Sequence, residues 1–201
     1  MLAGLILAGG RSSRMGTDKS LLTLPHSQET LLQHSQKRLA NICNHQVFVS
    51  GSTHPKGIAD VIPHCGPLSG IHGVIAHIKQ RGLPITELLI AAVDMPDLST
   101  EDFGHLLEQG RKHGNICAFE KYYLPLYLPI TKGVTAYLNT KLKYTLDNIE
   151  LPAKNSHYSI KALLAGLQGS EISPLNMSHL NNINTPSQWQ SHCARQSNSK
   201  V

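Results

Sequence analysis

Short apolar runs alternate with amphipathic segments along the first half of the chain. Leu2–Ala8 and Leu88–Val93 are apolar runs of the kind typical of strands that are buried on both faces of a parallel sheet. We expect shorter strands over Gln46–Ser50 and Asp60–Pro63. Between these strands, apolar residues recur at helical spacing: Leu31, Leu32, Leu39 and Ile42, and then Ile71, Val74, Ile75 and Ile78.

The second half of the chain is less regular but continues the same alternation. The expected elements are, in order, strands over Asn115–Glu120 and Tyr122–Leu128, helices over Val134–Leu146 and Ser159–Gln168, and a strand over Leu180–Ile183. Proline cannot donate a hydrogen bond to a strand ladder. Pro125 and Pro129 therefore place the strand over Tyr122–Leu128 at an edge of the sheet or at a bulge.

Two further helices have clear starting signals. Ser99 precedes Asp102 by three residues, which is the spacing of a capping box. Thr185 is followed by Pro186 at the first helical position and by Gln188, so a last helix is expected to begin there. The polar chain from His192 onward is expected to fray.

The alternation of strands and helices predicts an α/β fold. We expect a single three-layer α/β/α domain over residues 1–192, with a mostly parallel, Rossmann-like sheet, and a polar tail over residues 193–201. Ligands of such sheets bind at the carboxyl ends of the strands. The residues that follow Leu2–Ala8 and Leu88–Val93 are therefore where a site is expected.

Composition and charge narrow the possible partners. The chain has 201 residues, a formal net charge of +5 and a pI of about 9.1, but no dense basic block. An anionic ligand is favoured, and nucleic acid is not. Leu88–Val93 is far shorter than the roughly twenty residues of a membrane span, so we expect a soluble, cytoplasmic protein with no membrane partner. The four cysteines and twelve histidines show no metal-ligand spacing.

The loop after the first strand has the chemistry of a phosphate site. Gly9 and Gly10 allow a sharp turn and a close approach of a ligand to main-chain N–H groups. Arg14 and Lys19 add two cations to the same loop, which suits a polyphosphate. The loop matches neither the Walker A motif nor G-x-G-x-x-G. The alternative interpretation is a basic, glycine-rich surface loop.

Asp94 follows the most hydrophobic strand and precedes Met95 and Pro96. A carboxylate in that position can bind Mg²⁺ while substrate phosphates and water supply the other oxygens. It can also simply cap the turn at Pro96. The strand-end rule favours the metal site.

Two later segments remain open between a functional and a structural role. The glycine-rich turn Cys65–Gly70 either lines a pocket or only begins a helix. Asn182 and Asn184 are expected on one face of a strand, because they occupy alternate positions. Asn184 is a candidate to ligate the metal or hold substrate, and equally a candidate cap of the final helix.

The motifs taken together resemble those of the molybdenum cofactor guanylyltransferases, the MobA-type members of the nucleotidyltransferase superfamily. The resemblance extends over almost the whole chain, in the order Leu7-Ala-Gly-Gly-Arg-Ser-Ser-Arg-Met-Gly-Thr-Asp-Lys19, Gly66-Pro-Leu-Ser-Gly70, Val93-Asp-Met-Pro96 and Asn182-Ile-Asn-Thr-Pro186. The related cytidylyltransferases usually have Leu-Ala-Ala-Gly where this chain has Leu-Ala-Gly-Gly. The fold implied by the resemblance is that of the nucleotide-diphospho-sugar transferases.

The resemblance also implies roles for individual residues. The nucleotide would be bound by the first loop and by the positions near the second strand, namely by Leu7, Ala8, Gly9, Gly10, Lys19, Ser50, His64 and Asp94. Arg14, Lys19 and Asp94 would be the catalytic residues, Asp94 would also bind Mg²⁺, and Asn182 and Asn184 would lie on the acceptor side. Ser50 and His64 depart from the asparagine and the aspartate that are common in the family.

The reaction implied is the transfer of GMP from GTP to molybdopterin, with release of pyrophosphate. A phosphate nucleophile is already anionic at neutral pH, so the protein has to align two anions and absorb charge rather than supply a base. The implied partners are GTP, the molybdopterin cofactor, and molybdoenzymes or their chaperones. Two alternatives remain: a nucleotidyltransferase that uses CTP or another acceptor, and a guanine-nucleotide-binding module without catalysis.

Overall fold

The computed structural model describes residues 1–9, 15–44, 46–51, 54, 56–63, 65–147 and 158–198. Six strands form one sheet in the order β2-β1-β3-β5-β4-β6. Their bounds are β1 Leu2–Leu7, β2 Val47–Ser50, β3 Glu87–Ala92, β4 Cys117–Phe119, β5 Leu126–Pro129 and β6 Ser170–Ile172. The helices are α1 Leu31–Ile42, α2 Pro67–Gln80, α3 Thr100–His113, α4 Lys132–Asp147, α5 Ile160–Gly166 and α6 Pro186–Asn198, with short 3₁₀ turns η1 Lys19–Leu21 and η3 Met177–Leu180.

The sheet is mostly parallel, as predicted. β1 pairs in parallel with β2 and β3, and β4 pairs in parallel with β6. β5 is antiparallel to both of its neighbours, β3 and β4. Of the two placements expected for this strand, an edge or a bulge, the edge is wrong, because β5 is an inner strand of the sheet. Pro125 precedes the strand and Pro129 is its last residue, so both prolines lie outside its centre.

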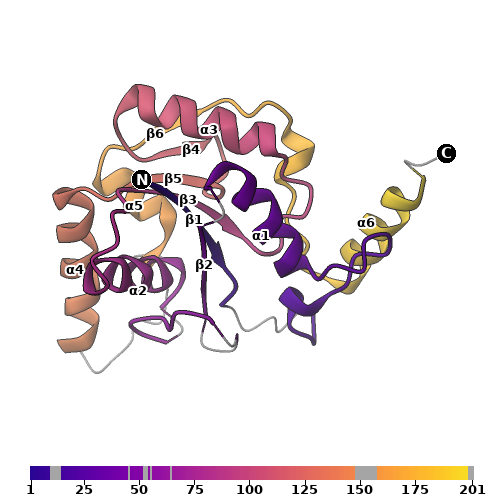
Figure 1. Cartoon of the computed structure of the whole chain (residues 1–201), viewed down its shortest axis with the longest axis horizontal. Helices are drawn as coiled ribbons and strands as arrows, with labels where there is room; N and C mark the ends of the chain where they lie inside the picture. The colour runs from indigo at the N-terminus through magenta and orange to yellow at the C-terminus, as the bar shows by residue number, and fades with distance from the viewer. Residues whose placement is uncertain are drawn as a thin grey trace.

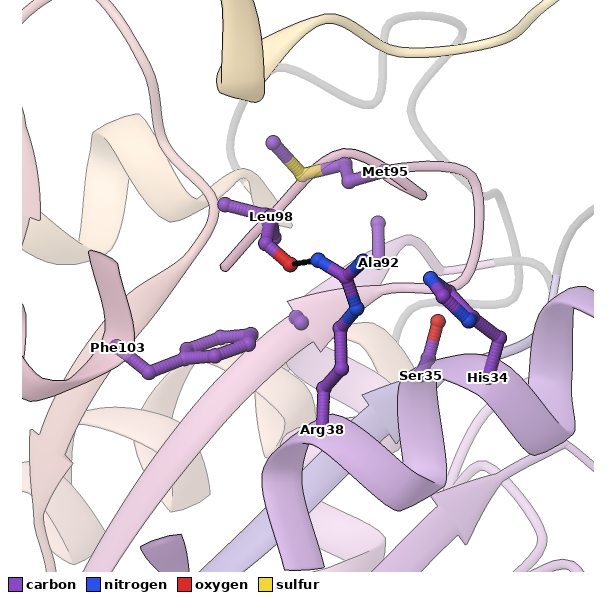
Figure 2. Close-up of a pocket in the computed structure, with 8 residues that line it drawn as sticks. His34, Ser35, Arg38, Ala92, Met95, Leu98 and Phe103 are labelled. Atoms are coloured by element: carbon purple, nitrogen blue, oxygen red, sulfur yellow. Dashed lines mark hydrogen bonds between the residues drawn. The ribbon is translucent and has the colours of Figure 1, made fainter. Parts of the chain in front are cut away.

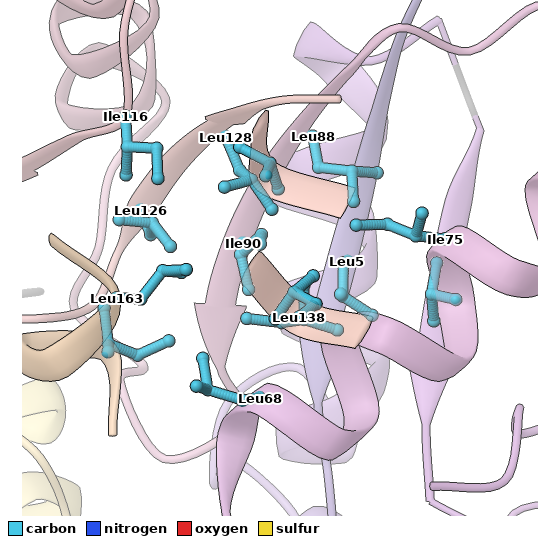
Figure 3. Close-up of a cluster of buried hydrophobic side chains, with 14 of the residues drawn as sticks. Leu5, Leu68, Ile75, Leu88, Ile90, Ile116, Leu126, Leu128, Leu138 and Leu163 are labelled. Atoms are coloured by element: carbon cyan, nitrogen blue, oxygen red, sulfur yellow. The ribbon is translucent and has the colours of Figure 1, made fainter. Parts of the chain in front are cut away.

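One face of the sheet is covered by α2, α4 and α5 (Figures 1 and 3). Leu5 and Ile90 point to this face and contact a fully buried cluster that includes Leu68 of α2, Leu138 of α4 and Leu163 of α5. Because these helices come from distant parts of the sequence, their packing holds both halves of the chain in one core.

The opposite face is covered by α1 and α3 (Figure 1). Ile6 and Leu89, which directly adjoin Leu5 and Ile90 in sequence, contribute to this second cluster with Leu39 of α1 and Leu106 of α3. Alternate residues of a strand point to opposite faces, so continuous apolar runs such as β1 and β3 are buried on both sides. The three-layer α/β/α prediction is confirmed.

Local capping signals position the helices. Thr30 and Ser99 form capping boxes at the starts of α1 and α3. At the start of α6, Gln188 Oε1 accepts hydrogen bonds from the backbone N–H groups of Asn184 and Thr185, at 2.7 and 3.1 Å. The predicted helix starts at Ser99 and Thr185 are therefore confirmed.

Several predicted elements differ from the structure. Asp60–Pro63 is not a strand, and the nearest pairing is an isolated bridge between Ser50 and Ile58. Leu180–Ile183 is also not a strand, because Leu180 ends η3 and the next residues have no regular structure. The boundary expected between residues 192 and 193 falls inside α6, which continues to Asn198. Within the described part of the chain, no helix is long and apolar enough to cross a membrane.

Candidate functional site

Three polar side chains from distant segments meet at the carboxyl edge of β1 and β3. Lys19 Nζ donates hydrogen bonds to Asp94 Oδ2 at 2.7 Å and to Asn184 Oδ1 at 2.8 Å. Lys19 and Asp94 are only 13% and 14% exposed, so the ion pair is largely shielded from water. These three are the residues that the sequence singled out in three separate motifs. The structure brings them together.

Lys19 is held by a short 3₁₀ turn. Asp18 caps η1 by accepting hydrogen bonds from the backbone N–H of Ser20 at 3.0 Å and from its hydroxyl at 2.7 Å. Ser20 is fully buried, and the backbone N–H of Leu31 donates to Leu22 O at 2.8 Å. The turn is thereby joined to the start of α1, which gives Lys19 a rigid base.

The segment that carries Asp94 is held by its neighbours on both sides. The backbone N–H of Ile183 donates to Asp94 O at 2.8 Å. From α1, His34 Nε2 lies 3.1 Å from Pro96 O and the guanidinium of Arg38 donates to Leu98 O (Figure 2). Burial lowers the pKa of His34, and the charge of Arg38 lowers it further. His34 is therefore a neutral donor at neutral pH.

The small hollow beneath this segment is a packing feature. It is lined by α1, by the end of β3 and the chain that follows it, and by Phe103 of α3 (Figure 2). Its volume of about 10 Å³ is no more than a single water molecule needs. A nucleotide therefore does not bind there.

A second group of residues lies at the carboxyl edge of β1 and β2. The backbone N–H of Ala8 donates to Ser50 O at 3.2 Å, which joins the two strand ends. A Cβ atom added to Gly9 would lie 3.7 Å from Asp60 Oδ2, and one added to Gly70 would lie 2.6 Å from Ser50 Oγ. The glycines thus leave space for Ser50 and Asp60 beside the first loop.

Asp60 is the residue that sequence reasoning missed. It is the one acidic residue between the second strand and the turn at Gly66, and that position was a usable signal. The sequence interpretation looked for this carboxylate at His64, which lies outside the described residues, and assigned Asp60 to a strand. Gly10 and Arg14 also lie outside the described residues.

The two asparagines do not form a pair. The predicted strand is absent, and Ile183 turns inward while Asn182 is exposed. Asn184 alone of the two contacts Lys19. The capping role considered for Asn184 belongs instead to Thr185, whose hydroxyl accepts from the backbone N–H of Gln188 at 3.3 Å.

The donors around Asp94 fit a hard cation. Among the described residues, Asp94 Oδ1 is buried and has no hydrogen-bond partner. A buried carboxylate oxygen of this kind is the ligand that Mg²⁺ takes alongside phosphates and water. No group of three or more His, Cys, Asp or Glu side chains with the arrangement of a metal cage occurs in the part of the chain that the structure describes.

The cysteines do not provide a nucleophile. Burial raises the pKa of Cys43 to about 12 and that of Cys117 to about 11. It also raises the pKa of Cys65 and Cys193. Since the thiolate is the reactive form, these thiols are inert at neutral pH. The arrangement around Lys19 is instead suited to binding and orienting anions.

Comparisons of the sequence with known proteins identify related chains. Residues 4–143 match the family described as the MobA-like NTP transferase domain. The chain is 36% identical over 190 residues to the molybdenum cofactor guanylyltransferase of Xanthomonas euvesicatoria, covering 92% of this chain and 91% of that protein. It is 29% identical over 196 residues to a probable molybdenum cofactor guanylyltransferase of Rhodopirellula baltica, covering 92% and 88%.

Solved structures share the fold. Molybdopterin-guanine dinucleotide biosynthesis protein A from Archaeoglobus fulgidus superimposes with a TM-score of 0.71 at 19% identity, covering 98% of this chain and all of that one. The 2-C-methyl-D-erythritol 4-phosphate cytidylyltransferase of Thermus thermophilus superimposes with a TM-score of 0.62 at 9% identity, covering 96% and 98%. The sheet and its helices are therefore shared with both of these proteins.

Proposed function

Because this chain belongs to the MobA-like NTP transferase family, we propose that it transfers GMP from GTP to molybdopterin and releases pyrophosphate. The observation that carries the proposal is the convergence of Lys19, Asp94 and Asn184 at the carboxyl edge of β1 and β3. This is where ligands of open α/β sheets bind. The relative with 36% identity over nearly the whole chain supports the same activity.

In the proposed reaction, an oxygen of the acceptor's terminal phosphate attacks the α-phosphorus of GTP. A new P–O bond forms, the bond to the β-phosphate oxygen breaks, and pyrophosphate leaves with the electron pair. The attacking oxygen is anionic and carries no proton that must be removed. The contribution of the protein is alignment of the two anions and electrostatic stabilisation of the transferring group.

Lys19 is suited to this task because an ammonium has three donor hydrogens. Asp94 and Asn184 accept two of them. The third is available for a phosphate oxygen without any change in the existing contacts. The ammonium would therefore already be oriented before the nucleotide arrives, which reduces the entropy lost on binding.

Mg²⁺ fits the same site, with Asp94 Oδ1 as the protein ligand and phosphate oxygens and water as the others. When bound, the ion would neutralise negative charge on the phosphates. Asp94 has one oxygen for this ion and the other for Lys19. A single carboxylate would thereby orient both positive charges of the site.

Asp60 supports the choice of guanine. Its two oxygens lie 3.7 and 3.9 Å from the position that a Cβ atom on Gly9 would take, and Gly9 is one of the residues that we assign to nucleotide binding. Guanine presents two adjacent donors, N1–H and N2–H, to which a carboxylate can bind in a bidentate manner. Cytosine and adenine lack this pair of donors, so a site built to bind it favours guanine over both.

The second candidate is a transferase that uses CTP. It is favoured by the position of Ser50, where asparagine is common in the family, and by the shared fold of cytidylyltransferases. For the main proposal, the guanylylated cofactor would pass to molybdoenzymes or their chaperones. We also propose that the protein is cytoplasmic.

The test is pyrophosphate release with molybdopterin and Mg²⁺ in the presence of GTP, CTP or ATP in turn. We expect release with GTP and little with the others. Release with CTP instead would overturn the guanine assignment, and tight GTP binding without release would identify a binding module.

A further inference from the structure

Helix α6 docks onto the segment after Asp94 through a buried histidine. His192 is 1% exposed, and its Nδ1 lies 3.5 Å from Asp97 Oδ2. Arg195 Nη2 lies 3.7 Å from the same carboxylate oxygen. The ring of Trp189 stacks on His192 with the centroids 5.7 Å apart and the planes 20° from parallel. The imidazole is therefore enclosed between an aromatic ring and a carboxylate.

Burial of this imidazole has an unfavourable free energy. Among the described residues, neither ring nitrogen of His192 has a hydrogen-bond partner. Burying a polar group without such a partner is unfavourable, and an apolar side chain would pack there at a lower cost. Burial alone would raise the pKa of Asp97, but His192, Arg195 and Arg38 lower it overall. A charged carboxylate therefore faces the imidazole at neutral pH.

The first turn of α6 connects this contact to the site. The backbone N–H of Asn184 donates to Gln188 Oε1 at 2.7 Å, so the helix start fixes the backbone of Asn184. The side chain of Asn184 in turn accepts from Lys19 Nζ at 2.8 Å. The segment that leads into α6 is thus attached at one end by the Ile183–Asp94 hydrogen bond and at the other by His192.

We infer that His192 is a positioning residue: by fixing α6 to Asp97, it keeps the amide oxygen of Asn184 on the ammonium of Lys19. The segment 94–97 and α6 then move as one unit, and Lys19 retains both of its acceptors when the nucleotide binds. The catalytic consequence rests on the proposed function, whereas the structural link between α6 and Asn184 does not.

The alternative is that His192 only adds to stability. Arg111 provides a matched control, because it forms an ion pair with Glu87 at 2.7 Å at the opposite end of β3, across a strand of six residues. Each substitution removes one contact between a basic side chain and a carboxylate. Only the contact of His192 is connected to Asn184.

The first experiment measures amide hydrogen exchange at Ile183 and Asn184 in His192→Ala, in Arg111→Ala and in the unmodified chain. We expect these amides to exchange at least about tenfold faster in His192→Ala and at an unchanged rate in Arg111→Ala. Equal exchange rates in the two variants would overturn the inference, regardless of their catalytic activity. If His192→Ala does not fold, Asp97→Asn keeps the side-chain volume and is judged by the same criterion.

The second experiment is a double-mutant cycle on kcat/KM with Asn184→Ala. If His192 acts through Asn184, His192→Ala lowers kcat/KM about tenfold in the normal background and less than about twofold in Asn184→Ala. His192→Gln, which keeps a polar N–H group facing Asp97, should restore part of the loss. Equal losses in both backgrounds would show an independent structural effect. Absence of turnover in the unmodified chain would refute the proposed function and leave the exchange result to decide the inference.

Discussion

Replacement of Lys19 by alanine removes the ammonium that joins Asp94 to Asn184. Its third donor hydrogen is the one that we assign to a phosphate of the nucleotide. A charge-assisted hydrogen bond contributes about 1.5–3 kcal/mol. Loss of one such contact should therefore weaken GTP binding roughly 10- to 140-fold, since each 1.4 kcal/mol is a factor of ten in affinity.

The loss should depend on magnesium. In Lys19→Ala, the Asp94 carboxylate is left without its counter-ion at a position that is only 14% exposed. Without Mg²⁺, this carboxylate repels the triphosphate, and the repulsion adds to the missing contact. With Mg²⁺ the metal compensates the carboxylate charge, so the variant should lose more affinity in the absence of Mg²⁺ than in its presence.

The assay is calorimetric titration with GTP, with and without Mg²⁺. Lys37→Ala is the matched control, because Lys37 is 70% exposed and pairs with Glu29 at 2.8 Å outside the site. It removes one positive charge and should leave GTP affinity unchanged. The reasoning is refuted if Lys19→Ala binds GTP within about twofold of the unmodified chain, or if Lys37→Ala loses as much.

Three further predictions address the base, the metal and the fold. Gly9→Ala places a Cβ 3.7 Å from Asp60 Oδ2, which is an ordinary contact distance, so the melting temperature should stay unchanged. Competition binding should show a smaller ratio of GTP affinity to CTP affinity than in the unmodified chain. Asp94→Asn keeps the turn but removes the negative charge that binds the metal, so Mg²⁺-dependent pyrophosphate release should be lost while circular dichroism stays unchanged. Normal release would indicate that Asp94 only caps the turn. The hydrogen bond and charge of Arg111, together with the hydrogen bond from Tyr127 and the charge of the N-terminus, lower the pKa of Glu87 from 4.5 to about 2. The stabilisation is therefore complete well above pH 4.5 and is lost as the pH falls toward 2. Urea unfolding at pH 7 and pH 3 should therefore show a larger loss of stability in the unmodified chain than in Arg111→Ala, and equal losses would contradict the assignment.

Local sequence signals were sufficient for much of the fold. The apolar runs that became β1 and β3, and the capping boxes that begin α3 and α6, were readable because burial on both faces and capping involve neighbouring residues. The same holds for the location of the site, since the carboxyl ends of β1 and β3 necessarily meet at one edge of a parallel sheet. The motifs alone therefore placed Lys19 and Asp94 at this edge.

Tertiary structure decided what depends on contacts between distant residues. β6 has only three residues, Ser170–Ile172, and exists because β4 offers it a partner. β5 is an inner strand despite its prolines, because its position depends on which strands pair. Asn184 contacts Lys19, from which it is separated by 165 positions in the sequence. Asp60 lies beside Gly9 in a segment that was predicted to be a strand and is not one. Such pairings depend on how the whole chain packs, so no local pattern of hydrophobic and polar positions encodes them.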